Sequence, residues 1–320
     1  MLIPLLLFAL SRLDAQSLSY SIRQIPLRMV LLLLGLQIVS QVLVNIQWYQ
    51  IAKFAGTGIS FGGMFYINCH GAVVDSITPG VKIGGEITRA VQIKRMGKCS
   101  GEQAAAVVAL QKMFSLGAFF FVNLFTVGYF VGGVALLQAS HTLFFVYGIL
   151  LLFLLMFASI FIAPRRTKAY LQARENPHFS WMRRVRGFLL ALLDQAVLIR
   201  KNRKAWIMLA LLSLLIWLLY PAKMYLLAIQ IVPDAHAGYM GAITFASYTV
   251  AMLPIFPGGL GGLEGTMSSL LLAIGFAISD AVVVTVLFRF VTFWFVMLFS
   301  LGFIAAHKTI RMLAGLQKRC

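Results

Sequence analysis

Acidic residues are scarce in this chain, which has 9 Asp and Glu against 27 Lys and Arg among its 320 residues. Charged residues of both signs make up only 11% of the sequence, compared with about 25% in soluble domains. Hydrophobic residues make up 61%, and the mean hydropathy is +0.90. One water-soluble core of this size cannot hide so many apolar side chains. This composition excludes a soluble globular protein and makes the lipid bilayer the expected solvent.

Cysteine is also rare, and the three cysteines, Cys69, Cys99 and Cys320, show no spacing pattern. They therefore predict neither a disulfide framework nor a metal site. The five histidines are scattered, and no H-E-x-x-H motif is present. The sequence also lacks the G-x-x-x-x-G-K-[ST] motif of an ATP site. We expect no metal and no cofactor, and we assign no catalytic residue.

The excess of positive charge is confined to connecting segments. Eleven Lys and Arg lie between residues 164 and 204, in a loop between apolar segments. This distribution is typical of the positive-inside rule and argues against nucleic-acid binding. We predict that 164–204 is a basic cytoplasmic helical loop. It either lies on anionic lipid or only fixes the topology.

Long apolar segments recur along the whole chain. Such segments must satisfy their backbone hydrogen bonds internally, and they lack the alternation of barrel strands. With residues 1–17 as a short first helix, they predict a single transmembrane domain over 1–320. The fold class is an all-α polytopic helical membrane protein with about nine crossing or partially crossing helices. The further segments are 27–54, 61–78, 103–133, 142–163, 205–231, 239–253, 263–278 and 281–306.

Loop charge predicts the orientation of these helices. Basic segments are expected on the cytoplasmic side and segments without Lys or Arg outside. Arg12, Arg23 and Arg28 place the first loop inside and the N-terminus outside, and the basic tail places the C-terminus inside. The other cytoplasmic segments are 80–102 and 164–204, and the other external segments are 133–141 and 232–238.

A nine-residue stretch occurs in two similar copies, TPGVKIGGE at 78–86 and FPGGLGGLE at 256–264. Proline and glycine break helices, and broken backbone inside a membrane is tolerated only where protein or a water-filled cavity covers it. Each copy therefore predicts a helix break or re-entrant turn that faces the protein interior. Helix ends exposed at such a break can hold charged groups. The alternative is tight glycine packing with the glutamates in interfacial water.

Each copy is followed by a cation within an apolar helix. Lys112 lies 26 residues after Glu86, and Arg289 lies 25 residues after Glu264. A charge at the bilayer centre costs about 2.5 kcal/mol or more, so each cation needs a partner. Two interpretations remain open together: internal ion pairs of each glutamate with its cation, and an internally duplicated transporter with a polar ligand site between the copies.

Polar residues near these cations follow helical spacing. Lys112 shares one stripe with Ser115 and Asn123, and Arg289 shares another with Thr285 and Thr292. On a third segment, Asn68 and Asp75 are seven residues apart. These stripes predict polar faces turned towards the protein interior.

Three stretches carry a resemblance to a known family: DSITPGVKIGGEITRAVQIKRMGKCSGEQAAAVVALQKM, LPIFPGGLGGLEGTMSSLLLAIG and LFRFVTFW. They resemble the transmembrane region of lysylphosphatidylglycerol synthases, within a broad flippase-like family, over roughly 27–307. The resemblance implies a polytopic protein of the inner (cytoplasmic) membrane that moves lipids or lipid-linked sugars between leaflets. Two departures are notable. Lys112 stands where many members have arginine, and no soluble aminoacyl-transfer domain follows before Cys320.

The sequence therefore predicts a flippase-like transporter rather than an enzyme. Its expected partners are the membrane and a phospholipid or a polyprenyl-phosphate-linked sugar. The alternatives are a membrane-embedded head-group transferase, in which Glu86 or Glu264 is a general base, and a non-catalytic scaffold of envelope assembly. The predicted substrate-binding residues, partly implied by the resemblance, are Asp75, Pro79, Gly80, Glu86, Arg89, Lys112, Pro257, Gly258, Gly259, Gly261, Glu264 and Arg289.

Overall fold

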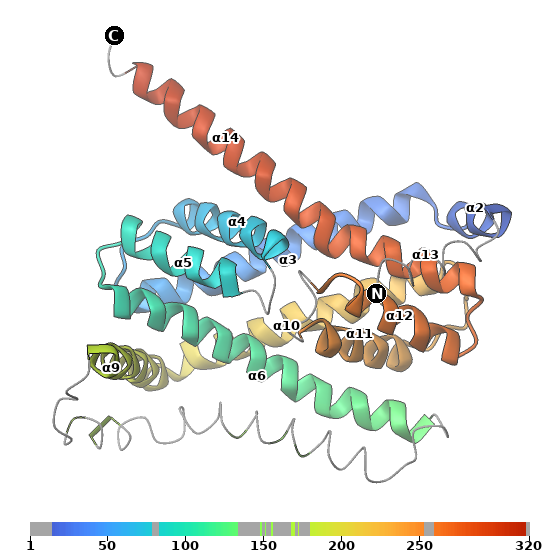
Figure 1. The fold of residues 1–320 in the computed structure, drawn as a ribbon, viewed down its shortest axis with the longest axis horizontal. Helices are drawn as coiled ribbons and strands as arrows, with labels where there is room; N and C mark the ends of the chain where they lie inside the picture. The colour runs from blue at the N-terminus through green and yellow to red at the C-terminus, as the bar shows by residue number, and fades with distance from the viewer. Residues whose placement is uncertain are drawn as a thin grey trace.

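The computed structural model describes residues 15–78, 83–133, 180–252 and 259–317, together with six single residues between 148 and 172. Every regular element in this described part is a helix, which confirms the all-α prediction (Figure 1). The elements are α2 (Ala15–Arg23), α3 (Leu27–Phe54), α4 (Phe61–Ile77), α5 (Ile83–Met96), α6 (Gly101–Gly133), α9 (Ser180–Lys201), α10 (Arg203–Ala228), α11 (Ala237–Ala251), α12 (Gly262–Ala273), α13 (Ile278–Arg289), the π-helix η3 (Phe290–Trp294) and α14 (Phe295–Gln317).

Four helical segments are long and apolar enough to cross a membrane. They are Leu27–Phe54, Gly101–Thr126, Arg203–Ala228 and the continuous stretch Ile278–Ile310. At 1.5 Å per residue each exceeds the roughly 30 Å hydrocarbon thickness of a bilayer. The protein is therefore a multi-pass helical membrane protein.

Helices α3 and α10 run antiparallel, and their pairing defines the two ends of the bundle. Lys223 near the end of α10 donates to Gln37 near the start of α3, whereas Gln47 pairs with Ser213 further along. The C-terminal end of α3 thus lies beside the N-terminal end of α10. We call this the basic end, because it carries Lys53 together with Arg203 and Lys204, and the other the opposite end.

Helices α4 and α5 form an antiparallel hairpin whose outer ends both lie at the basic end. The Lys98 amide, just after α5, donates to the Thr57 carbonyl just before α4 at 2.9 Å. The two helices have 17 and 14 residues, about 25 and 21 Å, so neither reaches across the hydrocarbon core. This hairpin therefore enters the bundle and returns to the same side.

Helices α11 and α12 form a second short hairpin, with 15 and 12 residues, that belongs to the opposite end. The start of α11 follows the end of α10, and a Cβ at Gly241 of α11 would lie 4.0 Å from Pro221 of α10. The end of α12 leads into α13, where Asp280 accepts a 2.6 Å hydrogen bond from Ser21 of α2. Because α2 immediately precedes the start of α3, both outer ends of this hairpin lie at the opposite end.

The two hairpins therefore enter the bundle from opposite ends. In Figure 1, α4 and α5 lie on the left and α11 and α12 on the right, with α3, α6 and α10 running across the picture between the two ends. The inner ends of all four short helices face the middle of the bundle. The two halves of the chain thus have inverted orientations, as in many transporters built from inverted repeats.

This arrangement corrects the sequence-based topology. The segment 61–78, predicted as a crossing or partially crossing helix, is one arm of the α4–α5 hairpin. Because α3 and α10 are antiparallel, Arg23 and Arg28 near the start of α3 lie at the opposite end from Arg203 at the start of α10, instead of on the same side. The predicted segment 142–163 and most of the N-terminal segment 1–17 lie outside the described residues.

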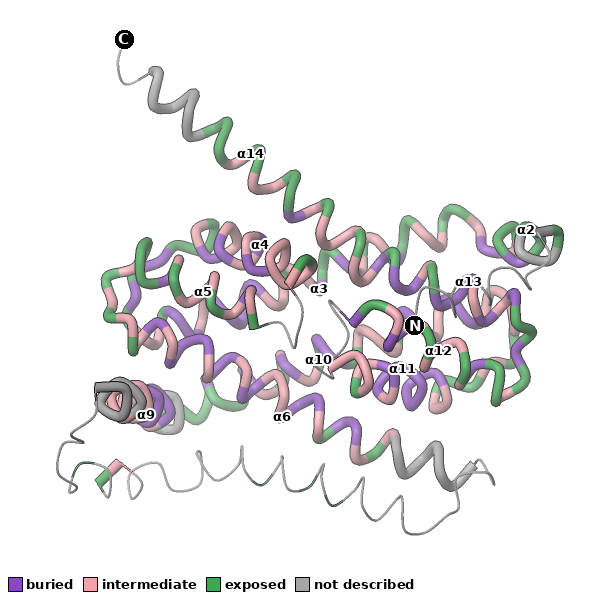
Figure 2. The backbone as a smooth tube through the Cα atoms, in the orientation of Figure 1, coloured by how far each residue is buried: buried purple, intermediate pink, exposed green. Residues whose placement is uncertain are grey.

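One helix runs crosswise to the spanning helices, and the last helix extends beyond the bundle. In Figure 1, α9 is seen nearly end-on at the basic end, where it packs against α6. This is part of the predicted basic loop 164–204, and residues 164–179 are described only at three single positions. At the same end, α14 extends beyond the bundle, and much of its projecting part is exposed (Figure 2).

Glycine allows α4 and α5 to approach closely. A Cβ at Gly85 would come within 3.0 Å of the backbone carbonyl of Gly71 and of the Asp75 carboxylate. Since the Gly71 oxygen is backbone, it cannot move aside without shifting α4. Only glycine at position 85 lets these two helices touch.

Labelling of single cysteines tests the hairpin topology. In a background in which Cys69, Cys99 and Cys320 are replaced, we expect Lys53→Cys and Lys98→Cys to react with an impermeant maleimide from one face. Asp234→Cys should react from the other face. Labelling of positions 53 and 98 from opposite faces would show that α4 crosses the bilayer.

Replacement of Gly85 tests the close helix contact. Gly85→Ala should lower the free energy of unfolding in micelles by about 2 kcal/mol, as overpacking does. Gly62→Ala is the matched control, because a Cβ there meets nothing within 4 Å, and we expect it to be neutral or stabilising by up to about 1 kcal/mol. Equal effects of the two changes would contradict the packing argument.

Candidate functional site

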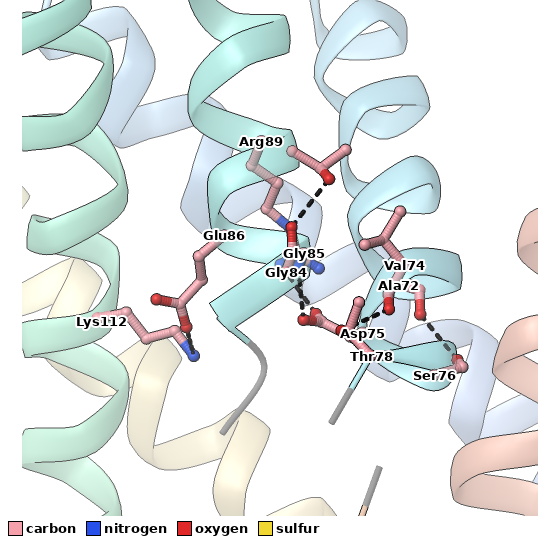
Figure 3. A network of polar contacts seen from close by, with 11 residues as sticks. Ala72, Val74, Asp75, Ser76, Thr78, Gly84, Gly85, Glu86, Arg89 and Lys112 are labelled. Carbon is pink, nitrogen blue, oxygen red and sulfur yellow. Dashed lines mark hydrogen bonds and ion pairs between the residues drawn. The ribbon is translucent and has the colours of Figure 1, made fainter. Parts of the chain in front are cut away.

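The first hairpin places a carboxylate against a cation on the next long helix. Glu86 in the first turn of α5 forms an ion pair with Lys112 of α6 (Figure 3). Their side chains are 24% and 26% exposed, so the pair remains reachable from outside the protein. The N-terminal position of Glu86 on α5 is also favourable for a negative charge.

A second ion pair holds the same hairpin closed. Arg89 of α5 contacts the Asp75 carboxylate of α4 at 3.0 Å, and the other oxygen of Asp75 accepts the Gly85 N–H at 3.0 Å (Figure 3). The Arg89 guanidinium also lies 5.5 Å from the centre of the Trp48 ring. Asp75 and Arg89 thus form an ion pair that links α4 to α5.

The second hairpin repeats the first arrangement. Glu264 in the first turn of α12 accepts a 2.7 Å bond from Arg289 Nε at the end of α13, and its other oxygen accepts the Gly261 N–H at 2.7 Å. The Arg289 guanidinium also lies 4.1 Å from the centre of the Phe293 ring. The internal ion pairs expected from the sequence spacing are therefore present in both halves.

Two glycines of the second motif have backbone conformations that suit glycine. Gly259 has φ +73° and Gly261 has φ +82°, a region that residues with a Cβ occupy only at a cost. This turn brings the Gly261 N–H to the Glu264 carboxylate, so the glycines position the first turn of α12. The other predicted motif residues, Pro79, Gly80, Pro257 and Gly258, lie outside the described residues.

The two cations lie at matching depths measured from opposite ends. Lys112 is eleven residues after Gly101, the first residue of α6, and Arg289 is eleven residues after Ile278, the first residue of α13. Eleven residues of helix span about 16 Å, close to half of the roughly 30 Å hydrocarbon core. Both ion pairs therefore sit near the middle of the bundle.

The two pairs differ in exposure and in the helix that follows. The Arg289 side chain is only 7% exposed and that of Glu264 20%, whereas the Glu86–Lys112 pair is about one-quarter exposed. The π-helix η3 begins directly after Arg289. Such wide turns are frequent at functional sites, and none occurs in the described part of α6.

The predicted polar stripes prove to be contacts between helices. Asn123 donates to Thr249, and Trp217 donates to Ser115, so these two residues pack α6 against α11 and α10. Thr285 accepts from Ser268 across α12 and α13. These residues stabilise the bundle, and only Lys112 and Arg289 of the two stripes join the ion pairs.

Sequence analysis missed a further set of buried polar groups. Gln47 of α3 links Ser213 of α10 to Gln111 of α6. Lys223 of α10 is completely buried and donates to Gln37 and Ser40 of α3. The signal that identified Lys112, a cation inside an apolar helix, also applies to Lys223.

Comparison with known proteins places the chain in a family. A sequence profile of the family described as "Lysylphosphatidylglycerol synthase TM region" matches residues 2–300. The chain belongs to this family. No group of three or more His, Cys, Asp or Glu side chains gathers among the described residues.

Curated relatives are described as UPF0104 membrane proteins of archaea. The protein of Methanothermobacter thermautotrophicus is 22% identical over 83% of this chain and 82% of its own length. That of Pyrococcus horikoshii is 24% identical over 90% of this chain and 89% of its own. A relative from Methanocaldococcus jannaschii is 30% identical over 32% of this chain and 30% of its own length.

The difference in burial between the two ion pairs predicts a difference in stability. Arg289→Met should lower the free energy of unfolding in micelles by about 3 kcal/mol, since it leaves a largely buried carboxylate without its partner. Lys112→Met should cost about 1 kcal/mol, because solvent screens the more exposed Glu86. Adding Glu264→Gln to Arg289→Met should recover much of the loss. Additive single effects in this double-mutant cycle would contradict a direct interaction.

Proposed function

We propose that this protein is a flippase-like transporter that moves an anionic lipid or a polyprenyl-phosphate-linked sugar between leaflets. The observation that carries the proposal is the pair of inverted hairpins, each ending in a carboxylate–cation pair near the middle of the bundle. Buried charges of this kind are costly in a membrane and commonly mark a substrate pathway. Inverted repeats with broken helices commonly place their site at the repeat interface.

In this proposal the two carboxylates occupy the place of the substrate's anionic group. A phosphate entering the site would replace Glu86 at Lys112, or Glu264 at Arg289. Arginine suits this exchange because its guanidinium binds phosphate through two parallel hydrogen bonds. The glycines around Gly259 and Gly261 would let the head group approach the backbone of α12, while the apolar tails stay in the lipid.

The roles of the predicted substrate-binding residues differ under this proposal. Lys112 and Arg289 are the groups that bind the head group, and Glu86 and Glu264 exchange with it. Asp75 and Arg89 position the hairpin through their mutual ion pair. We also propose that the remaining predicted residues Pro79, Gly80, Pro257 and Gly258 contribute to substrate binding.

We further propose that the basic end is cytoplasmic and that the protein resides in the inner (cytoplasmic) membrane. The side chains of Lys53, Lys94, Arg203 and Lys204 at this end are exposed, and cytoplasmic loops are enriched in Lys and Arg. The α4–α5 hairpin would then enter from the cytoplasm and the α11–α12 hairpin from outside. In this orientation the C-terminal end of α14 is cytoplasmic, and alternating movement of the two hairpins would give access to each leaflet in turn.

Reconstitution tests the transport proposal. Purified protein in liposomes should move head-group-labelled phosphatidylglycerol between leaflets, measured by quenching of the label with an impermeant reductant. Glu264→Gln and Arg289→Ala should each slow this movement at least tenfold, the effect of about 1.4 kcal/mol on a barrier. The reason is that each change removes one member of the exchanging pair.

The matched control is Glu102→Gln, which changes an exposed carboxylate at the start of α6 and should leave the rate unchanged. Wild-type rates in both site variants, or no movement by the wild-type protein, would contradict the proposal. Chemically altered head groups recovered from the liposomes would instead favour a transferase.

A further inference from the structure

Lys223 is a buried cation that neither ion pair explains. It lies five residues before the end of α10, and its residue is 0% exposed. Its ammonium group donates to Gln37 Oε1 and, at 3.0 Å, to Ser40 Oγ, and it lies 4.7 Å from the centre of the Tyr220 ring. All three partners are neutral, so they solvate the charge without cancelling it.

The other cations in the middle of the bundle have carboxylate partners. Arg89, Lys112 and Arg289 each form an ion pair, whereas no carboxylate in the described part of the chain lies within 4.0 Å of Lys223. Four cations and three carboxylates thus lie within the described interior. With Lys223 protonated, the described interior carries an excess of one positive charge.

A second buried donor beside Lys223 has no hydrogen-bond acceptor in the described part of the chain. Gln37 presents its oxygen to the ammonium, which turns its Nε2 away, and that buried nitrogen has no acceptor among the described residues. An amide nitrogen is a donor only. Between α3 and α10, the described surroundings of Lys223 thus offer two neutral oxygen acceptors but no carboxylate within 4.0 Å, and the unbonded Gln37 Nε2 adds positive potential.

Aromatic side chains lie between Lys223 and the second ion pair, Glu264–Arg289. The Tyr220 ring lies 5.1 Å from that of Tyr248, which in turn lies 6.4 Å from Phe288, the neighbour of Arg289. Because these groups exclude water, the field of Lys223 is screened less on this path than it would be in solution.

We propose that Lys223 is a specificity-determining residue whose uncompensated charge makes the embedded site prefer lipids that carry a net negative charge. It acts at a distance on the site proposed above, so the inference rests on the proposed function for the identity of that site. The ligand class is a phosphate ester on an apolar tail, either a phosphodiester lipid or a polyprenyl phosphate. The excess positive charge does not raise the affinity for a zwitterionic lipid, because the net charge of that lipid is zero.

Binding in detergent gives a test that does not depend on transport. Thermal unfolding is measured in micelles doped with phosphatidylglycerol, polyprenyl phosphate or phosphatidylcholine, and the midpoint concentration of each lipid's stabilising effect is compared. We expect the wild-type protein to bind at least one anionic lipid roughly tenfold more tightly than phosphatidylcholine, the scale of one unit charge acting over about 10–15 Å at intermediate dielectric. Comparing phosphatidylglycerol with polyprenyl phosphate shows which of the two phosphate-containing lipids the site binds.

The variants separate charge from packing and hydrogen bonding. Lys223→Met keeps the length of the side chain, and Lys223→Gln keeps a donor for Gln37 and Ser40, yet both should abolish the anionic preference. Lys223→Arg should retain it. The control Lys204→Met removes an exposed lysine from the same helix and should retain the preference too.

The outcomes distinguish this inference from the proposed function. Equal binding of anionic and zwitterionic lipid by the wild-type protein, or an unchanged preference in Lys223→Met and Lys223→Gln, would overturn the role of Lys223. Loss of preference in these variants supports it, whether or not liposomes show lipid movement. Absence of movement with a Lys223-dependent preference would overturn transport alone.

Discussion

Every polar group that leaves a regular helix within a bilayer must find its partner inside the protein, because lipid offers none. This constraint explains the main features of the structure. The two hairpins place the inner ends of their helices in the middle of the bundle, and the carboxylates in the first turns of α5 and α12 pair with cations on neighbouring helices. Where two helices must touch, as α4 and α5 do at Gly71 and Gly85, glycine provides the contact.

The inverted arrangement gives the two ion pairs equal depth from opposite ends, yet the pairs are not equivalent. Glu86 and Lys112 are more exposed than Glu264 and Arg289, and only the second pair is followed by a π-helix. A protein with two inverted halves would show such a difference between its two ion pairs in any single conformation. The more exposed pair is then the one more easily separated by an incoming anion.

Much of the fold and of the candidate site was predictable from single residues and their spacing. Apolar runs indicated the spanning helices, and a cation inside an apolar run implied a buried partner, as Lys112 and Arg289 show. The same rule applied to Lys223 would have found a third buried cation within an apolar helix. It could not have found that Lys223 has only neutral partners, because these come from α3, more than 180 residues earlier.

The sequence by itself determined that this chain is a helical membrane protein with two similar Pro–Gly motifs and two glutamate–cation pairs. Hydropathy and helix-breaking residues act locally, so they can be recognised without knowing the fold. Only the tertiary structure decided that the α4–α5 hairpin returns to the side from which it came and that the two hairpins are inverted. A short apolar helix can cross or turn back with the same composition, and the choice depends on which neighbours cover it, as the contact of Lys98 with Thr57 illustrates.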